Sequence, residues 1–227
     1  MSDDTHLLDE LAGLRKSGRL RSLRTLRGPI GPVAEVDGRH VLILCSNNYL
    51  GLATDERLKA ASCSAINSYG TGATGSRLIS GNSELYTALE EDVALLKSTE
   101  AALVFSSGYH ANLGAITALA GPADAIFSDE LNHASIIDGA RLSRASIHVY
   151  RHGDVAHLEQ LLINDKSKGR KLIATESVFS MDGDIAPIKQ ICSLARRHQA
   201  RVLVDEAHAT GVIGAKGEGV VGALGLT

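Results

Sequence analysis

The sequence has no tryptophan, few prolines and no excess of positive charge. Its 23 basic and 26 acidic residues give a net charge of −3, which argues against a nucleic-acid-binding protein, because such proteins usually carry a strong basic excess. The three cysteines, Cys45, Cys63 and Cys192, are far apart and show no CxxC spacing. We therefore expect them to be reduced, small core residues of a cytoplasmic protein.

Long apolar runs and a leader segment are also lacking. No run of about 18 apolar residues occurs, so the sequence predicts no membrane-spanning helix. The polar, acidic start Met1-Ser2-Asp3-Asp4 does not resemble a signal peptide. With 227 residues and 44 % hydrophobic residues, the chain can form one large α/β domain or two small ones, and it lacks the composition of a disordered protein.

The first part of the chain predicts a helical arm followed by a hairpin. Residues 4–27 have a charged, helical pattern that Gly28-Pro29 ends. The basic residues of this arm form either a solvated helix face or an anion site; they are Arg15, Lys16, Arg19, Arg21, Arg24 and Arg27. Residues 33–36 and 41–45 predict two strands joined by a turn at Asp37-Gly38. We therefore assign residues 1–45 to this arm and hairpin.

From residue 46 onward, strand-length apolar runs alternate with helical patterns. The runs are residues 101–105, 125–127, 147–150, 172–175 and 202–204, and the helical patterns are 55–69, 83–97, 109–120, 134–143, 154–163 and 187–199. This alternation predicts an α/β fold with a mostly parallel sheet covered by helices on both faces. Ligands of such sheets bind beyond the carboxyl ends of the strands, so the residues that follow each run are the candidate site.

Three of these segments carry suitable polar groups. Gly108 and Tyr109 lie where a turn enters a helix, which favours phosphate binding, although an ordinary capped turn has the same pattern. His133 begins the next helix and could stack on a planar ring or be structural. Ser180 lies in a loop rich in Asp and Gly, and its neighbours Phe179 and Met181 indicate a packed loop.

The most informative segment is Asp205-Glu206-Ala207-His208, which follows the last apolar run. A carboxylate at the end of a buried strand is costly without a cationic partner, and a protonated pyridine nitrogen is such a partner. The alternative is a metal site made by Asp205, Glu206 and His208. Against it, consecutive residues of a strand point to opposite faces, and no further Cys/His cluster lies nearby in sequence.

The glycine-rich segment 70–75 reads as GxGxxG, but it follows a helical pattern instead of a strand. It is not a Walker A loop either, because Ser76-Arg77 stands where Lys-Ser/Thr is required. We therefore interpret it as a segment whose backbone approaches another group closely.

Taken together, six segments in order resemble the α-oxoamine synthase family of fold-type-I enzymes that use pyridoxal 5′-phosphate (PLP). They are residues 47–52, 72–77, 106–109, 128–135, 178–183 and 205–208. The resemblance implies that residues 46–227 are part of the large PLP-binding domain of a PLP-dependent transferase, incomplete at its C-terminus. It further implies a homodimer.

The resemblance also implies roles for individual residues. Gly108 and Tyr109 would lie at the cofactor near its phosphate, and His133 would stack on the ring. Asp205 would pair with the ring nitrogen, and Ser180 and His208 would bond the phenolic oxygen. His133, Asp205 and His208 are thus the candidate catalytic residues. Arg24, with Arg21 as an alternative, would meet the carboxylate of the acyl substrate, and Asn47 would border the substrate pocket.

The implied reaction is the decarboxylative condensation of an amino acid with an acyl-CoA or acyl-carrier thioester. Residues 107–113 and 207–212 most resemble members that condense alanine with a pimeloyl thioester; members that condense glycine with acetyl-CoA are the alternative. In the family a lysine beyond the Asp-x-x-His motif holds the cofactor covalently. None of the eight lysines of this sequence matches it, and Lys216 matches a surface turn. We therefore expect a truncated chain without its C-terminal domain, inactive alone, or a non-catalytic partner subunit.

Overall fold

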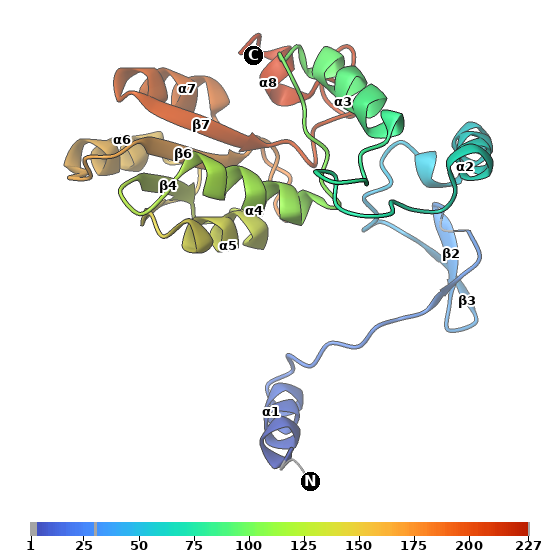
Figure 1. Cartoon of the computed structure of the whole chain (residues 1–227). Coiled ribbons are helices and arrows are strands. Elements are labelled where there is room, and N and C mark those ends of the chain that lie inside the picture. Colours follow the sequence, from blue (N-terminus) through green and yellow to red (C-terminus); the bar gives the residue numbers. More distant parts are fainter. Residues whose placement is uncertain (1–3, 30, 227) are drawn as a thin grey trace. The chain divides into compact units, whose positions relative to one another are not determined.

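The protein is described here from a computed structural model that covers residues 4–29 and 31–226. Residues 1–3, Ile30 and Thr227 therefore lie outside the described residues. The chain forms two compact units, which divide between Gly70 and Thr71. Figure 1 shows the elements of each unit.

The first unit contains helices and a small antiparallel sheet. Its elements are α1 (Thr5–Lys16), β1 (Leu26–Arg27), β2 (Val33–Val36), β3 (Arg39–Leu42), η1 (Leu52–Thr54) and α2 (Glu56–Tyr69), and its strand order is β1-β2-β3. The predicted hairpin is confirmed, because Val36 pairs with Arg39 across the turn, but the second strand spans Arg39–Leu42 and not the predicted residues 41–45. Asp37 and Gly38 have φ of 52° and 75°, the positive values that a tight two-residue hairpin turn requires.

The predicted helix over residues 4–27 is wrong beyond Lys16. Helix α1 ends there because Gly18 adopts a left-handed φ of 68°. The amides of Gly18 and Arg19 then donate to the carbonyls of Arg15 and Leu14, at 3.1 and 2.9 Å. This pattern satisfies the last carbonyls of a helix and stops it. The basic residues of the arm are therefore spread over a helix, an extended segment and β1.

The second unit is a parallel α/β sheet, as the sequence predicts. Its elements are α3 (Glu84–Lys97), α4 (Gly108–Leu119), β4 (Ala125–Asp129), α5 (Ala134–Ser143), β5 (Ser146–Tyr150), α6 (Val155–Asn164), β6 (Lys171–Glu176), α7 (Ile188–Arg197), β7 (Ala200–Asp205) and α8 (Gly219–Ala223). The sheet order is β5-β4-β6-β7, and each neighbouring pair is parallel. Only the short, glycine-containing α8 was not anticipated from the sequence.

Two buried clusters show that the sheet is covered on both faces. Phe127 and Ile173 pack with Leu158 of α6 and Leu194 of α7. The next residues along the same strands, such as Ile126, pack with α4 and α5 on the other face. Figure 1 shows the same layers, with α4 and α5 on one side of the sheet and α6 and α7 on the other. Alternating side chains of the buried strands thus fill two cores.

The connections of the sheet reverse direction between β4 and β6. Helix α5 leads from β4 to β5 on one face, whereas α6 and α7 lead to β6 and β7 on the opposite face. Ligands of open α/β sheets bind at such a switch point, beyond the carboxyl ends of the strands. The topology therefore directs attention to the residues that follow β4, β6 and β7.

Two predictions from the sequence are wrong, one about a strand and one about the burial of cysteines. Residues 101–105 do not form a strand; the amide and carbonyl of Val104 instead bond to the side chains of Glu90 and Arg77, at 2.7 and 3.0 Å. Cys45 and Cys63 are exposed instead of being core residues, because they lie after β3 and on the largely exposed α2. Cys192 is partly buried against the apolar cluster beside α7 and α8.

Within the described residues, no helix is long and apolar enough to cross a membrane.

Candidate functional site

Three carboxylates terminate the strands at one edge of the sheet. Asp129 is the last residue of β4, Glu176 of β6 and Asp205 of β7. Glu176 and Asp205 are direct neighbours in the strand register. Because like charges at this spacing repel, the edge is suited to binding positive or hydrogen-bond-donating groups.

Asp205 is held by two neutral donors from different elements. The side-chain amide of Asn112, on α4, donates to Oδ2 at 2.7 Å, and the backbone amide of Ala207 donates to Oδ1 at 2.9 Å. Asn112 also donates to Ser135 Oγ, on α5, at 2.9 Å. The contacts fix the carboxylate in place without neutralising its charge.

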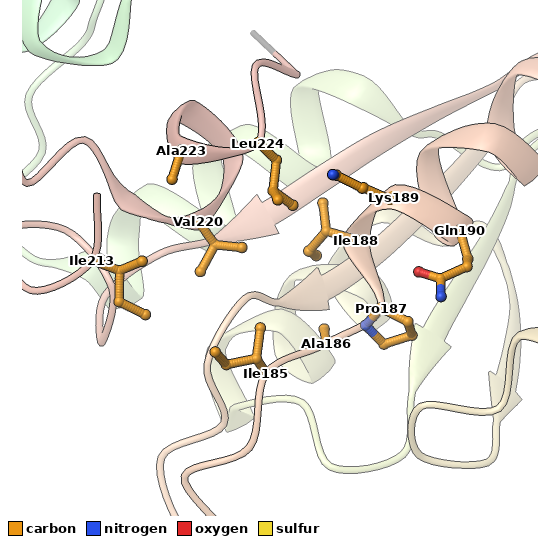
Figure 2. Close-up of a pocket in the computed structure, with 10 residues that line it drawn as sticks. All are labelled: Ile185, Ala186, Pro187, Ile188, Lys189, Gln190, Ile213, Val220, Ala223 and Leu224. Atoms are coloured by element: carbon orange, nitrogen blue, oxygen red, sulfur yellow. The ribbon is translucent and has the colours of Figure 1, made fainter. Parts of the chain in front are cut away.

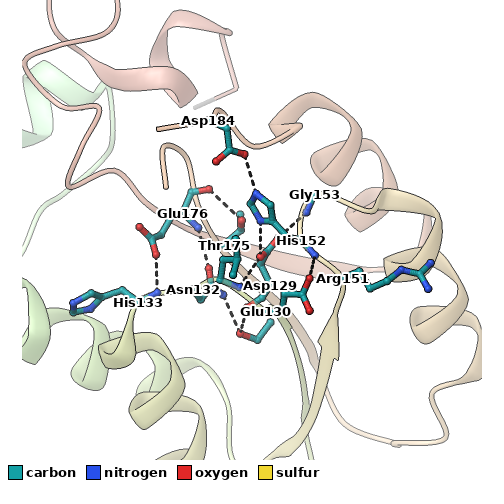
Figure 3. A network of polar contacts seen from close by, with 12 residues as sticks. Asp129, Glu130, Asn132, His133, Arg151, His152, Gly153, Thr175, Glu176 and Asp184 are labelled. Atoms are coloured by element: carbon teal, nitrogen blue, oxygen red, sulfur yellow. Dashed lines mark hydrogen bonds and ion pairs between the residues drawn. The ribbon is translucent and has the colours of Figure 1, made fainter. Parts of the chain in front are cut away.

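His133 joins this chain of hydrogen bonds at the start of α5. Its Nδ1 lies 2.8 Å from Ser135 Oγ, so Ser135 connects it to Asn112 and thereby to Asp205. Its backbone amide donates to Glu176 Oε1 at 2.6 Å, a bond drawn in Figure 3. The residue is exposed, which leaves its ring accessible to a ligand. The structure thus brings two predicted site residues, His133 and Asp205, into one network.

Glu176 is one of the residues at this edge that the sequence analysis did not single out. Burial raises the pKa of its carboxyl, and the charge of Asp205 raises it further, while the amide of His133 and the charges of His133 and His208 act in the opposite direction. Its own amide donates to Asn132 Oδ1 at 3.2 Å. The sequence pattern that marked Asp205 could also have identified Glu176, because each is a carboxylate that directly follows a buried apolar run.

The side chains of Asp205 and Glu206 have different partners, as expected because consecutive residues at a strand end point to opposite faces. Glu206 binds Lys97 Nζ at 2.8 Å and accepts the amide of Val221 at 3.0 Å. Lys97 is partly buried and also donates to Thr210 Oγ1 at 2.7 Å. In the part of the chain that the structure describes, no group of three or more His, Cys, Asp or Glu could hold a metal ion.

The amino end of α4 carries the predicted phosphate-binding residues. Ser107 caps the helix by accepting the amide of His110 at 3.2 Å. A Cβ atom placed on Gly108 would meet nothing within 4 Å, so open space lies beside the first turn. The Tyr109 hydroxyl donates to the carboxylate of Asp138 on α5, which raises the pKa of Tyr109. An open helix start can accept an anion.

Ser180 lies at the tip of a tight loop formed by residues 178–185. Val178 and Ile185 form an antiparallel bridge at its base. The amide of Phe179 donates to the carbonyl of Asp184 at 3.1 Å, and that of Gly183 donates to the carbonyl of Phe179 at 2.8 Å. Phe179 is buried, as expected of a packed loop, but that expectation is wrong for the tip, where Ser180 is exposed and Met181 is 91 % exposed.

An apolar cavity of about 330 Å³ lies beside α7 and α8. Figure 2 shows side chains such as Ile188, Val220 and Leu224 pointing toward it. Lys189 and Gln190 are the lining residues with polar side chains. Because the lining is otherwise apolar, we place the chemistry at the strand ends and not in this cavity.

The remaining predicted residues are distributed between the two units. His208 follows β7 and influences the pKa of Glu176. Arg24 and Asn47 belong to the first unit, whereas the other candidates belong to the second. Arg24 lines a cavity of about 430 Å³ together with Leu26 and Val36, and Asn47 Oδ1 lies 3.4 Å from the Tyr49 hydroxyl.

Comparison with known proteins gives consistent matches. The family described as "Aminotransferase class I and II" matches residues 39–224. The chain is 53 % identical over 218 residues to an 8-amino-7-oxononanoate synthase of Citrifermentans bemidjiense, covering 96 % of this chain and 56 % of the relative. It is 54 % identical over 210 residues to an 8-amino-7-oxononanoate synthase of Geobacter sulfurreducens, covering 92 % and 54 %.

A solved structure is similar over nearly the whole chain. Serine palmitoyltransferase from S. paucimobilis, with bound PLP and myriocin, gives a TM-score of 0.89 at 36 % identity, covering 98 % of this chain and 58 % of that one. The chain therefore spans about half the length of the curated relatives that it matches.

Proposed function

The chain belongs to the aminotransferase class I and II family, and from this premise we propose that it forms the cofactor-binding part of a PLP-dependent acyltransferase. The proposed reaction condenses alanine with a pimeloyl thioester to give 8-amino-7-oxononanoate, a step in biotin synthesis. The observation that carries the proposal is the network from Asp205 through Asn112 and Ser135 to His133. The relatives named 8-amino-7-oxononanoate synthase support the choice of substrates.

The residues at the strand ends fit PLP. The contacts described for Asp205 come from an amide side chain and a backbone amide, so its charge is available for a protonated ring nitrogen. His133 would stack on the ring, the start of α4 at Gly108 and Tyr109 would receive the phosphate, and Ser180 and His208 would bond the phenolic oxygen. When bound, PLP supplies an electron sink that stabilises negative charge on the amino-acid substrate.

Two residues of the first unit are proposed to bind the substrates. We propose that Arg24 receives the carboxylate of the acyl substrate and that Asn47 borders the amino-acid pocket. We propose further that the complete enzyme acts in the cytoplasm as a homodimer. We also propose a domain boundary after residue 45, which separates the arm and hairpin from α2. The structural division lies later, at Gly70, and keeps α2 in the first unit.

We infer that none of the lysines of this sequence holds PLP covalently, and the structure gives a reason for two of them. Lys171 begins β6, at the end of the strand opposite Glu176, and Lys97 is engaged by Glu206. We therefore propose that a polypeptide of these 227 residues binds PLP without a covalent bond and has no turnover alone. Such a polypeptide could also act as a non-catalytic partner, which co-purification with a lysine-containing relative would support.

Titration of the purified chain with PLP, followed by absorbance, tests the site. We expect Asp205→Asn to weaken binding about 100-fold, since removing one partner of a buried ion pair costs about 3 kcal/mol. Asp92→Asn, on the exposed surface of α3, is the matched control and should bind like the wild type. Equal affinity of the Asp205 variant, or a single lysine labelled stoichiometrically after borohydride treatment, would contradict the proposal.

Substrate choice is tested on the complete reading frame that encodes these residues. The assay supplies alanine or glycine with pimeloyl-CoA or acetyl-CoA and identifies the products by mass spectrometry. We expect 8-amino-7-oxononanoate from alanine and pimeloyl-CoA. Turnover restricted to glycine and acetyl-CoA would instead identify a glycine C-acetyltransferase.

A further inference from the structure

His152 lies between two carboxylates at the edge of the sheet. Its Nδ1 is 2.9 Å from Asp129 Oδ1, and its Nε2 is 2.9 Å from Asp184 Oδ2 (Figure 3). A neutral imidazole carries one N–H, whereas the imidazolium carries two. Because a carboxylate faces each ring nitrogen, both hydrogen bonds form together only when His152 is charged.

One end of this bridge is fixed to the sheet. Asp129 ends β4 and is buried, with a side chain that is only 2 % exposed. Its carboxylate also accepts the backbone amides of Leu131 and Gly153, each at 3.0 Å. The backbone amide of His152 in turn donates to Glu130 Oε1 at 2.8 Å. The imidazole is therefore anchored on a rigid element.

The other end of the bridge holds the loop of residues 178–185. Asp184 lies on one arm of the loop, and the ring of Phe179, on the other arm, meets the imidazole edge-on with 4.4 Å between centroids. Ser180 directly follows Phe179 at the exposed tip. His152 thus contacts both arms of the segment that presents Ser180.

We propose that charged His152 is a positioning residue that ties the loop 178–185 to the end of β4 and so sets the position of Ser180. This inference deepens the proposed function and rests on it in one respect, namely that Ser180 bonds the cofactor. His152 itself need not touch substrate or cofactor. It acts through Asp184, and its protonation state controls the bridge.

The electrostatic surroundings of His152 favour the charged form. Burial lowers the pKa of the imidazole, but the hydrogen bonds and charges of Asp129 and Asp184 outweigh this effect and raise it above 6.5. Other titratable or charged groups on the adjoining segments are Glu130, Tyr150, Arg151, Asp154 and His157. The stabilisation of the folded chain by charged His152 is therefore complete below about pH 6.5. It is lost as the pH rises through the raised pKa of this histidine.

Hydrogen exchange and NMR on the chain without cofactor test the bridge. The amides of Phe179 and Gly183 report on the loop, because both are hydrogen-bonded within it. After correction for intrinsic rates, we expect their protection in the wild type to fall at alkaline pH. His152→Gln should raise the exchange rates of these two amides about tenfold at low pH, because it removes a hydrogen bond to a charged group. It should also abolish the pH dependence of their protection.

Asp184→Asn is a second variant that leaves the buried Asp129 paired. It should lower the pKa of His152 measured by NMR, whereas Asp182→Asn, an exposed change in the same loop, should not. A His152 pKa at or below 6.5 in the wild type would overturn the proposal. Unchanged loop protection in His152→Gln would overturn it as well.

PLP titration of the same proteins separates this inference from the proposed function. If the wild type does not bind PLP, the proposed function fails, while the exchange data still decide whether the bridge exists. If the wild type binds PLP, His152→Gln should bind it several-fold more weakly, with a loss of the pH dependence. An unchanged affinity in a variant with a loosened loop would refute the link between His152 and Ser180.

Discussion

At the scale of single residues, the site contains two neighbouring carboxylates, Asp205 and Glu176, that lie in different environments. Asp205 receives two neutral donors, from Asn112 and Ala207. Glu176 is buried and accepts the amide of His133, and its pKa is raised by burial and by the charge of Asp205. The two carboxylates at this edge therefore differ in environment, and burial holds that of Glu176 closer to its neutral form.

The raised pKa of Glu176 predicts a pH-dependent stability. The folded chain binds the proton more tightly than the unfolded chain, so Glu176 lowers the free energy of unfolding as the pH rises from about 4.5 through the folded pKa. Glu176→Gln keeps an acceptor for His133 but removes the charge. We expect the stability of the variant relative to the wild type to increase as the pH rises from about 4.5 through the folded pKa, as measured by urea unfolding.

Glu91→Gln, on the exposed side of α3, serves as the control and should show little pH-dependent difference. A stability difference for Glu176→Gln that does not change with pH would show that folding leaves the pKa of this carboxyl unshifted.

At the scale of elements, close packing of α4 on α5 places Asn112 against Asp205. A Cβ atom on Gly139 of α5 would lie 3.0 Å from Ile116 Cδ1 and 3.2 Å from the carbonyl oxygen of Asn112. Glycine at this position therefore lets the two helices approach each other closely. The same approach brings Ser135 within reach of the Asn112 side chain.

Gly139→Ala should therefore disturb both stability and site. Overpacking costs about 1–3 kcal/mol, and the better helix propensity of alanine offsets at most about 1 kcal/mol of this. We expect a lower urea midpoint and weaker PLP binding. Gly13→Ala, in a helix where the new Cβ atom meets nothing within 4 Å, should be neutral or stabilising. Equal behaviour of the two variants would show that the α4–α5 contact adapts without cost.

At the scale of the whole molecule, large apolar side chains remain exposed. Leu78 and Ile79 are 95 % and 86 % exposed, and Leu95 and Leu103 are also exposed. Exposed apolar surface on a soluble protein can mark an interaction site or an aggregation hazard. This surface is consistent with the proposed homodimer.

We expect the purified chain to self-associate at micromolar concentration, as measured by sedimentation velocity. Leu78→Gln combined with Ile79→Gln should reduce the association, because it replaces apolar surface with polar groups. Arg141→Gln, which changes an exposed charged residue, should leave it unaltered. A monomeric wild-type chain would contradict the prediction.

The sequence by itself determined the features that depend on local pattern. Buried apolar runs predict β4 to β7, helical periodicity predicts α2 to α7, and Asp37-Gly38 predicts the hairpin turn. These predictions succeed because side-chain periodicity and turn chemistry act within a few residues. The six ordered motifs likewise led to the correct family; in the structure Asp205 ends β7 and His133 caps α5.

Tertiary structure alone decided which distant residues meet. Residues 101–105 read as a strand, but Val104 is bonded by Arg77 and Glu90. Asn112 reaches Asp205 across 93 positions of sequence, and His152 reaches Asp184 across 32. No local pattern encodes such pairs, because the order of the strands and the face on which each helix packs determine them. The sequence therefore determined which chemical groups are available, and the sheet topology determined which of them act together.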